Sequence, residues 1–263
     1  MIQSSSADQS GSIHPRGSFE DFLKGDSVAL FDGAMGMLFY QKGIFVNRAF
    51  EELNLTEPEL VKELHTSYVE AGADIIETNT FSANRFRLQP FGLADKVQEI
   101  NASAVSIAQE AAAGRAWIAG AMGPLGVRIE PFGKIAKAEA REVFCEQARA
   151  LIEAGVDLIV LETFSHLPEL EEAIAAIQSV ATIPIAAQVT VTNGGLTREG
   201  VPADEVAQRL EAAGADIVGV NCSEPLAGLD AIVDMHEATK LPLIGQPNAG
   251  QPRSIGGRNL YLA

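Results

Sequence analysis

Three stretches of this chain repeat one short pattern, in which a small-residue segment containing a glycine runs into an aspartate and then a short apolar run. The copies cover residues 70–79, 153–162 and 212–222. Each glycine suits the left-handed residue that ends a helix, and each apolar run has the length of a strand buried on both faces. Five residues after the three aspartates come Asn79, Glu162 and Asn221. The repeat therefore predicts a parallel α/β protein whose strands deliver polar groups at their C-terminal ends.

Strand-like runs alternate with helix-like segments along the chain. The predicted strands cover residues 28–31, 74–77, 117–120, 157–161, 183–189, 216–220 and 242–245. Such alternation leaves a doubly wound open sheet or a barrel, and seven strands in 263 residues favour the barrel. Only residues 251–263 follow the seventh strand. We therefore expect an α/β fold, a (β/α)8 TIM-type barrel that lacks its eighth strand and closing helix.

One helix start is marked clearly, in front of the strand at 74–77. Thr56 and Glu59 have the spacing of a capping box, and Pro58 suits the first turn between them. This pattern predicts a helix that begins after Thr56 and ends at Gly72.

Composition indicates one barrel-like domain over residues 18–263, preceded by a tail over residues 1–17 that is rich in Ser, Gly and Gln and is predicted to be disordered. The net charge of −16 would repel nucleic acid and anionic membrane surfaces, and the apolar runs are far shorter than the ~20 residues that span a bilayer. With two cysteines and no secretory leader, we expect a cytoplasmic protein.

Three carboxylates follow predicted strands at the same edge of the sheet. Asp32, Glu77 and Glu162 end the first, second and fourth strands. Converging acids at a barrel mouth can bind a substrate ammonium group or act as bases. They can also be structural partners of backbone amides or of Arg side chains, and the residues alone leave both interpretations open.

Cys222 ends the sixth predicted strand, beside Asn221. A thiolate at this edge can be a nucleophile or a metal ligand, although free cysteines often serve only as small apolar residues. The chain has no Cys-x-x-Cys and no His-x-x-x-His spacing, so the residues alone do not define a metal site.

The motifs at the strand ends together resemble those of the homocysteine S-methyltransferase domain, from about residue 26 to the end. They are Phe31-Asp32-Gly33-Ala34-Met35-Gly36, Glu77-Thr78-Asn79-Thr80-Phe81, residues 120–126, Leu161-Glu162-Thr163-Phe164, Gly219-Val220-Asn221-Cys222 and Gln246-Pro247-Asn248-Ala249-Gly250. Within the family, the chain looks most like the N-terminal domain of bacterial enzymes that fuse this domain to a methylenetetrahydrofolate reductase.

The resemblance implies a Zn²⁺-dependent transfer of a methyl group to the thiol of homocysteine, which gives methionine. Cys222 matches the first of three zinc-binding cysteines, and Asp32 and Glu162 match acids that hold the homocysteine amino group. Positions that line the pocket are matched by Glu77, Thr78, Asn79 and Asn221, and Gly33 suits a close approach of the backbone to the substrate. The implied partners are homocysteine, a methyl donor and a fused or separate reductase or folate domain.

This chain departs from the family pattern at its end. The second and third zinc ligands are adjacent cysteines in a Gly-Gly-Cys-Cys segment at the eighth strand, and the sequence stops before it. Two alternatives therefore stay open beside the methyltransferase: an inactive or amino-acid-binding fragment, and a barrel lyase or aldolase that uses the carboxylates without zinc. Because the missing strand would leave unpaired edges, we also expect the isolated chain to associate or to be poorly soluble.

Overall fold

The structure is a computed structural model that describes residues 17–44, 48–192, 194–249, 253–255 and 258–260. Apart from Gly17, the predicted tail lies outside these residues. The helices are α1 (Phe19–Leu23), α2 (Met35–Gln41), α3 (Leu53–Thr56), α4 (Pro58–Glu70), α5 (Arg85–Leu88), α6 (Val97–Ala112), α7 (Lys137–Ala154), α8 (Leu167–Val180), α9 (Ala203–Ala213) and α10 (Pro225–Ala238), with short 3₁₀ turns at Phe50–Glu52, Gln89–Phe91 and Ala94–Lys96. The strands are β1 (Ile75–Glu77), β2 (Trp117–Met122), β3 (Leu158–Phe164), β4 (Ile185–Val189), β5 (Ile217–Asn221), β6 (Leu243–Gln246), β7 (Arg253–Ile255) and β8 (Arg258–Leu260).

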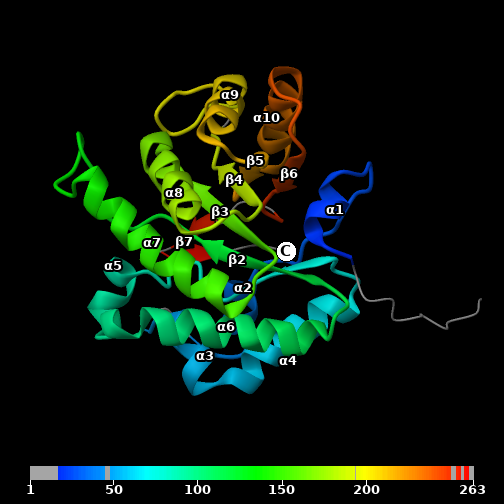
Figure 1. Ribbon diagram of the computed structural model, residues 1–263, viewed down its shortest axis with the longest axis vertical. Coiled ribbons are helices and arrows are strands. Elements are labelled where there is room, and N and C mark those ends of the chain that lie inside the picture. Colours follow the sequence, from blue (N-terminus) through cyan, green and yellow to red (C-terminus); the bar gives the residue numbers. More distant parts are fainter. Residues whose placement is uncertain (1–16, 45–47, 193, 250–252, 256–257, 261–263) are drawn as a thin grey trace, which may run out of the picture.

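The first six strands form one parallel sheet in chain order, β1-β2-β3-β4-β5-β6. The sheet curls into a partial barrel, and α4, α6, α7, α8, α9 and α10 follow one another around its outer face (Figure 1). The β7 and β8 strands pair antiparallel in a separate small sheet. Within the described residues, the parallel α/β architecture is therefore confirmed as a six-stranded partial barrel.

The predicted first strand at residues 28–31 is wrong as a full strand. Only Phe31 forms a bridge, to Ile75 of β1, and the carbonyl of Leu30 accepts from the amide of Asp74 at 2.7 Å. Val28 is 88% exposed and Leu30 is 63% exposed. Because their side chains gain little burial beside β1, the apolar run yields only a short paired stretch.

The predicted capping box is also wrong. The α4 helix does begin at Pro58, but Glu57 precedes it without a side-chain cap bond. Thr56 is the last residue of α3, and its hydroxyl donates to the carbonyl of Glu52 at 3.2 Å. A preceding short helix thus takes up the residue that would have capped α4.

The repeated pattern has a direct structural role. Gly72, Gly155 and Gly214 all have positive φ, at 101°, 94° and 93°, as predicted for residues that end helices. The aspartate two positions later accepts a hydrogen bond from a backbone amide of the neighbouring segment, which is β2 for Asp157, β4 for Asp216 and the short paired stretch before Asp32 for Asp74. The pairs are Asp74 with Leu30 (2.8 Å), Asp157 with Ile118 (2.7 Å) and Asp216 with Ile185 (2.9 Å). Each repeat therefore joins the incoming strand to the segment that lies beside it.

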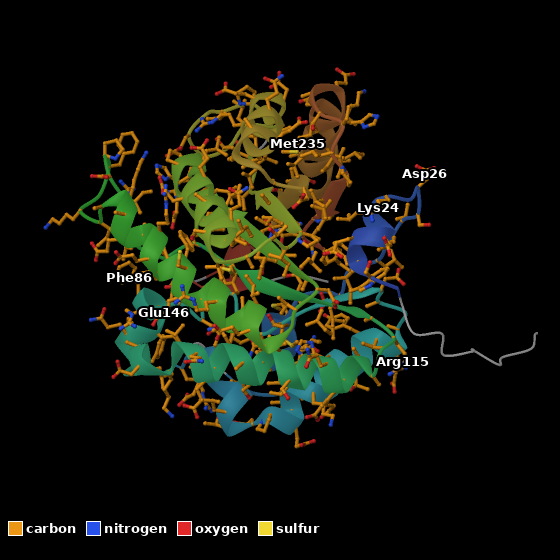
Figure 2. All side chains as sticks on the ribbon, viewed as in Figure 1. Lys24, Asp26, Phe86, Arg115, Glu146 and Met235 are labelled. Atoms are coloured by element: carbon orange, nitrogen blue, oxygen red, sulfur yellow. The ribbon has the colours of Figure 1, made fainter. Side chains whose placement is uncertain are left out.

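Apolar side chains fill both faces of the parallel sheet. One buried cluster lies between the sheet and the helices, and it includes Met235 on the inner side of α10 (Figure 2). A second cluster lies inside the curl, where α1 places Phe19 and Phe22 against Trp117. The indole Nε1 of Trp117 donates to the carbonyl of Gly17 at 2.9 Å. In the part of the chain that the structure describes, no helix is long and apolar enough to cross a membrane.

Candidate active site

A layer of polar side chains lies directly above the apolar residues inside the curl. Side chains alternate between the two faces of a strand, so residues two positions apart share a face. Ile75, Val160, Ala186 and Ile244 belong to the inner apolar cluster, which the same strands continue at their C-terminal ends with polar residues. This inner polar layer consists of Glu77, Glu162, Gln188, Asn221 and Gln246.

The structure brings together the three carboxylates singled out in the sequence. The backbone amide of Glu77 donates to Oδ2 of Asp32 at 3.0 Å, and the carboxyl groups of Glu77 and Glu162 share a hydrogen bond. Among the described residues, no Arg or Lys pairs with any of the three. The alternative in which Arg side chains neutralise them therefore finds no support in this part of the chain.

Burial governs the protonation of this acid cluster. It raises the pKa of Asp32 and of Glu162 well above the usual range, and the charge of Glu77 raises both further. Burial also raises the pKa of Glu77, against the lowering effect of its hydrogen bonds with Gln246 and Glu162. Because a cation nearby would relieve both the desolvation and the repulsion, the cluster favours a ligand with a positive group such as an ammonium.

Asn221 connects the acid cluster to Cys222. Its Nδ2 donates to Oε2 of Glu162 at 3.0 Å and to Oγ1 of Thr163 at 2.8 Å, and its Oδ1 accepts from the amide of Thr163 at 2.8 Å. The hydroxyl of Thr163 lies 3.5 Å from Sγ of Cys222. Glu162, the amide of Asn221 and the thiol thus form one hydrogen-bonded group.

Two residues of this group have strained backbones. Thr163 has φ 64° and Cys222 has φ 48°, in the left-handed region that residues other than Gly, Asn and Asp rarely adopt. Such conformations cost about 1–3 kcal/mol each and persist where the surroundings impose them. The hydrogen bonds between Asn221 and Thr163 hold this strained corner beside the acid cluster.

Cys222 is exposed at the mouth of the curl. Desolvation by its packed side, and to a lesser extent the charges of Glu162 and Glu77, raise the pKa of its thiol, whereas the hydrogen bond with Thr163 lowers it. No group of three His, Cys, Asp or Glu side chains among the described residues is arranged to hold a metal ion. One thiol does not make a zinc site by itself, so the residues in this part of the chain do not fit the metal that the resemblance implies.

Three of the predicted pocket residues have other immediate partners. The hydroxyl of Thr78 lies 2.6 Å from that of Thr80, and Nδ2 of Asn79 donates to the carbonyl of Phe50 at 2.8 Å. Gly33 faces the side chain of Tyr68, whose hydroxyl would lie 2.9 Å from a Cβ at this position. These contacts hold the loops that follow residue 31 and β1.

Two glutamines of the polar layer were missed as site residues. Gln188 donates from Nε2 to Oε1 of Gln246, and Gln246 donates from Nε2 to Oε1 of Glu77, both at 2.7 Å. Gln188 is fully buried within an apolar strand. The sequence signal that could have identified Gln188 is its position: it is a polar residue near the C-terminal end of an otherwise apolar strand.

A groove on the outer surface lies apart from this site. It has a volume of about 1030 Å³ and is lined by α5 and α7 side chains, among them Phe86 and Glu146, which neighbour each other in Figure 2. Arg85 and Glu146 form an ion pair there. The groove shares no residue with the inner polar layer.

Known proteins resemble this chain in sequence and fold. Its residues 29–262 match the homocysteine S-methyltransferase family. Methionine synthase of Mycobacterium tuberculosis is 29% identical over 86% of the chain, which spans 20% of that protein, and betaine–homocysteine S-methyltransferase 1 of Mus musculus is 31% identical over 86%, spanning 58%. The homocysteine methyltransferase MmuM of Escherichia coli, solved in a metallated form, has a TM-score of 0.78 at 23% identity, covering 88% of this chain and 87% of its own, a likeness of fold. The chain belongs to the homocysteine S-methyltransferase family.

Proposed function

We propose that this chain binds homocysteine at the mouth of the curled sheet, as part of an enzyme that transfers a methyl group to the homocysteine sulfur and yields methionine. The observation that carries the proposal is the meeting of Asp32, Glu77 and Glu162 beside the thiol of Cys222. Family membership supports the same substrate.

The residues of the site would act mainly by binding and orientation. The substrate ammonium group would take the place of protons held by the acid cluster, because a cation offsets the desolvation of those carboxylates. Asn221 and Thr163 would fix Glu162 relative to Cys222 through their shared hydrogen bonds. In the transfer, the homocysteine sulfur forms a bond to the methyl carbon, the donor leaves with the electron pair of its own bond to that carbon, and the thiol proton is lost.

Calorimetric titration with three ligands tests the proposal. L-Homocysteine has an amino group and a thiol. Of the two analogues, 4-mercaptobutanoate lacks the amino group and 2-aminobutanoate lacks the thiol. We expect homocysteine to bind at least about tenfold more tightly than 4-mercaptobutanoate, as one charge-assisted hydrogen bond provides. Equal affinity for these two ligands, or no binding of homocysteine, would contradict the assignment of the acid cluster.

A second candidate is amino-acid binding without turnover. It is favoured by the single thiol at the mouth of the curl, that of Cys222, because no group of three His, Cys, Asp or Glu side chains among the described residues is arranged to hold a metal ion. Zinc content per folded chain, measured by elemental analysis after dialysis with Cys222→Ala as the control, separates the two candidates. About one zinc per chain, lost in the variant, supports methyl transfer; no zinc, together with homocysteine binding, supports binding alone.

The lyase or aldolase alternative has less support. A Schiff-base aldolase would need a lysine at the site, and none of the six parallel strands in the described residues ends in Lys. We further propose a cytoplasmic setting, consistent with two free cysteines, and a reductase or folate domain as the source of the donor.

A further inference from the structure

Gln188 is a fully buried amide whose presence packing alone does not explain. It lies on β4, two positions after Ala186 of the inner apolar cluster, so its side chain shares the inner face. Its Oε1 is buried and accepts no hydrogen bond from the described residues. Burying an unpartnered polar atom costs about 1–3 kcal/mol, and an apolar side chain of the same length would avoid that cost.

The hydrogen bond of Gln188 determines which way the amide of Gln246 faces. Because Nε2 of Gln188 donates to Oε1 of Gln246, the NH₂ group of Gln246 must face the other way, where it donates to Oε1 of Glu77. A reversed amide would place two donors together at Gln188 and two acceptors together at Glu77. We call these two hydrogen bonds the relay. In it each amide nitrogen donates to the next residue, from Gln188 on β4 through Gln246 on β6 to Glu77 on β1.

The hydrogen bond between Gln188 and Gln246 crosses β5, which has no side chain opposite Gln188 although it carries Asn221 beside Gln246. β5 lies between β4 and β6, and its residue paired with Gln188 is Gly219. A Cβ at Gly219 would lie 1.9 Å from the backbone oxygen of Ile244, so the position accepts only glycine in this packing. The missing side chain leaves Gln188 and Gln246 free to meet across the inner face.

The relay ends at the central member of the acid cluster. Glu77 bonds Asp32 through its backbone amide and Glu162 through its carboxyl group. The hydrogen bond from Gln246 to Oε1 of Glu77 restricts the rotation of that carboxylate. It therefore determines which carboxylate oxygen faces the other acids of the cluster.

We propose that Gln188 is a positioning residue for the amino group of the substrate. It orients Gln246, which holds Glu77 in the arrangement where the acid cluster receives an ammonium group. This inference rests on the proposed homocysteine site, but it concerns a residue that does not touch the substrate.

The test compares the full chain with Gln188→Met, which keeps the side-chain length and removes both polar atoms. Calorimetry would measure affinity for L-homocysteine and for 4-mercaptobutanoate under reducing conditions. We expect Gln188→Met to weaken homocysteine binding about tenfold and to leave 4-mercaptobutanoate within about twofold. A merely structural role would move both affinities together or neither.

Two further variants keep the test decisive. Gln188→Glu turns the position into an acceptor, which reverses the Gln246 amide and turns its oxygen toward Glu77, so we expect a larger loss for homocysteine than with Gln188→Met. In a Glu77→Gln background, Gln188→Met should cause no further loss, because both changes act through one carboxylate. Additive losses would overturn the relay.

The outcomes separate this inference from the proposed function. If the unmodified chain prefers homocysteine to 4-mercaptobutanoate but Gln188→Met leaves that preference intact, only the role of Gln188 is overturned. If the unmodified chain shows no preference, the acid cluster does not receive the amino group, and both are overturned.

Discussion

Asn221 donates from its Nδ2 to Oε2 of Glu162 at 3.0 Å, which joins β5 to β3 across the inner face of the sheet. The two strands are separated by β4, so this hydrogen bond, the Asn221–Glu162 tie, links strands that are not paired with each other. The same amide group donates to the hydroxyl of Thr163. Changes at Asn221 should therefore reveal how far this tie stabilises the strained corner at Thr163 and Cys222.

Replacing the amide of Asn221 by a carboxylate should destabilise the chain. In Asn221→Asp, two acids would face each other without a donor, and we expect the free energy of unfolding to fall by about 2–4 kcal/mol at pH 8. Urea unfolding measures this loss. The double variant Asn221→Asp, Glu162→Gln exchanges donor and acceptor and should recover at least half of it; a double variant as unstable as the single one would show that the tie is not responsible.

The acid cluster should make the ligand-free chain less stable as pH rises. Carboxyl groups with raised pKa bind protons more strongly in the folded than in the unfolded state, so their contribution to stability is present at low pH and is lost as pH rises through the folded values. Asp32→Asn keeps an acceptor for the amide of Glu77 but removes one of these acids. We expect its melting temperature, relative to the unmodified chain, to rise between pH 5 and pH 8.

Homocysteine supplies an internal check on that result. If the ammonium group replaces protons at the cluster, saturating ligand should reduce the pH dependence of the unmodified chain. Identical pH profiles for Asp32→Asn and the unmodified chain, with and without ligand, would show that Asp32 does not titrate in this range.

His65 should have the opposite effect on stability. It is buried on α4 with both ring nitrogens unpartnered among the described residues, and desolvation lowers its pKa to about 4. A histidine with a depressed pKa contributes stability above its unfolded value of 6.5, and this is lost as pH falls toward 4. We expect a loss of about 2–3 kcal/mol between pH 7.5 and pH 4.5.

The variant His65→Leu measures this contribution. Denaturant unfolding at the two pH values should show a smaller difference for His65→Leu than for the unmodified chain. His236→Leu, on the exposed side of α10, is the matched control and should leave the difference unchanged. Parallel behaviour of both variants would rule out His65 as the source.

Three apolar side chains on α10 should promote association of the chain. Leu226, Leu229 and Val233 recur at helical spacing and are 69%, 58% and 52% exposed. Changing all three to Gln should shift the chain toward monomer in sedimentation velocity, with homocysteine affinity unchanged. Phe132→Gln, at a residue outside α10 that is 69% exposed, is the control. A monomer before any substitution would contradict the expectation of self-association.

The sequence pattern predicted the parallel strands and the convergence of Asp32, Glu77 and Glu162, because chain direction and strand period place strand ends at one edge. It did not predict the relay through Gln188, since the partner of a buried amide depends on strand order and curl rather than on neighbouring residues. The left-handed Thr163 had no sequence signal, because a branched residue does not favour that conformation. The misplaced strand at 28–31 failed because apolar character predicts burial only where a second surface covers it.

The separation of the inner apolar cluster from the polar layer has an evolutionary consequence. Five of the six parallel strands contribute to both, but at different positions, so mutations that alter chemistry fall on residues outside the inner apolar cluster. A library randomised at residues 77, 188 and 246, with the stabilising pair Glu162 and Asn221 kept, should therefore retain many folded members with new ligand preferences. The same backbone can in this way be inherited by enzymes with different reactions.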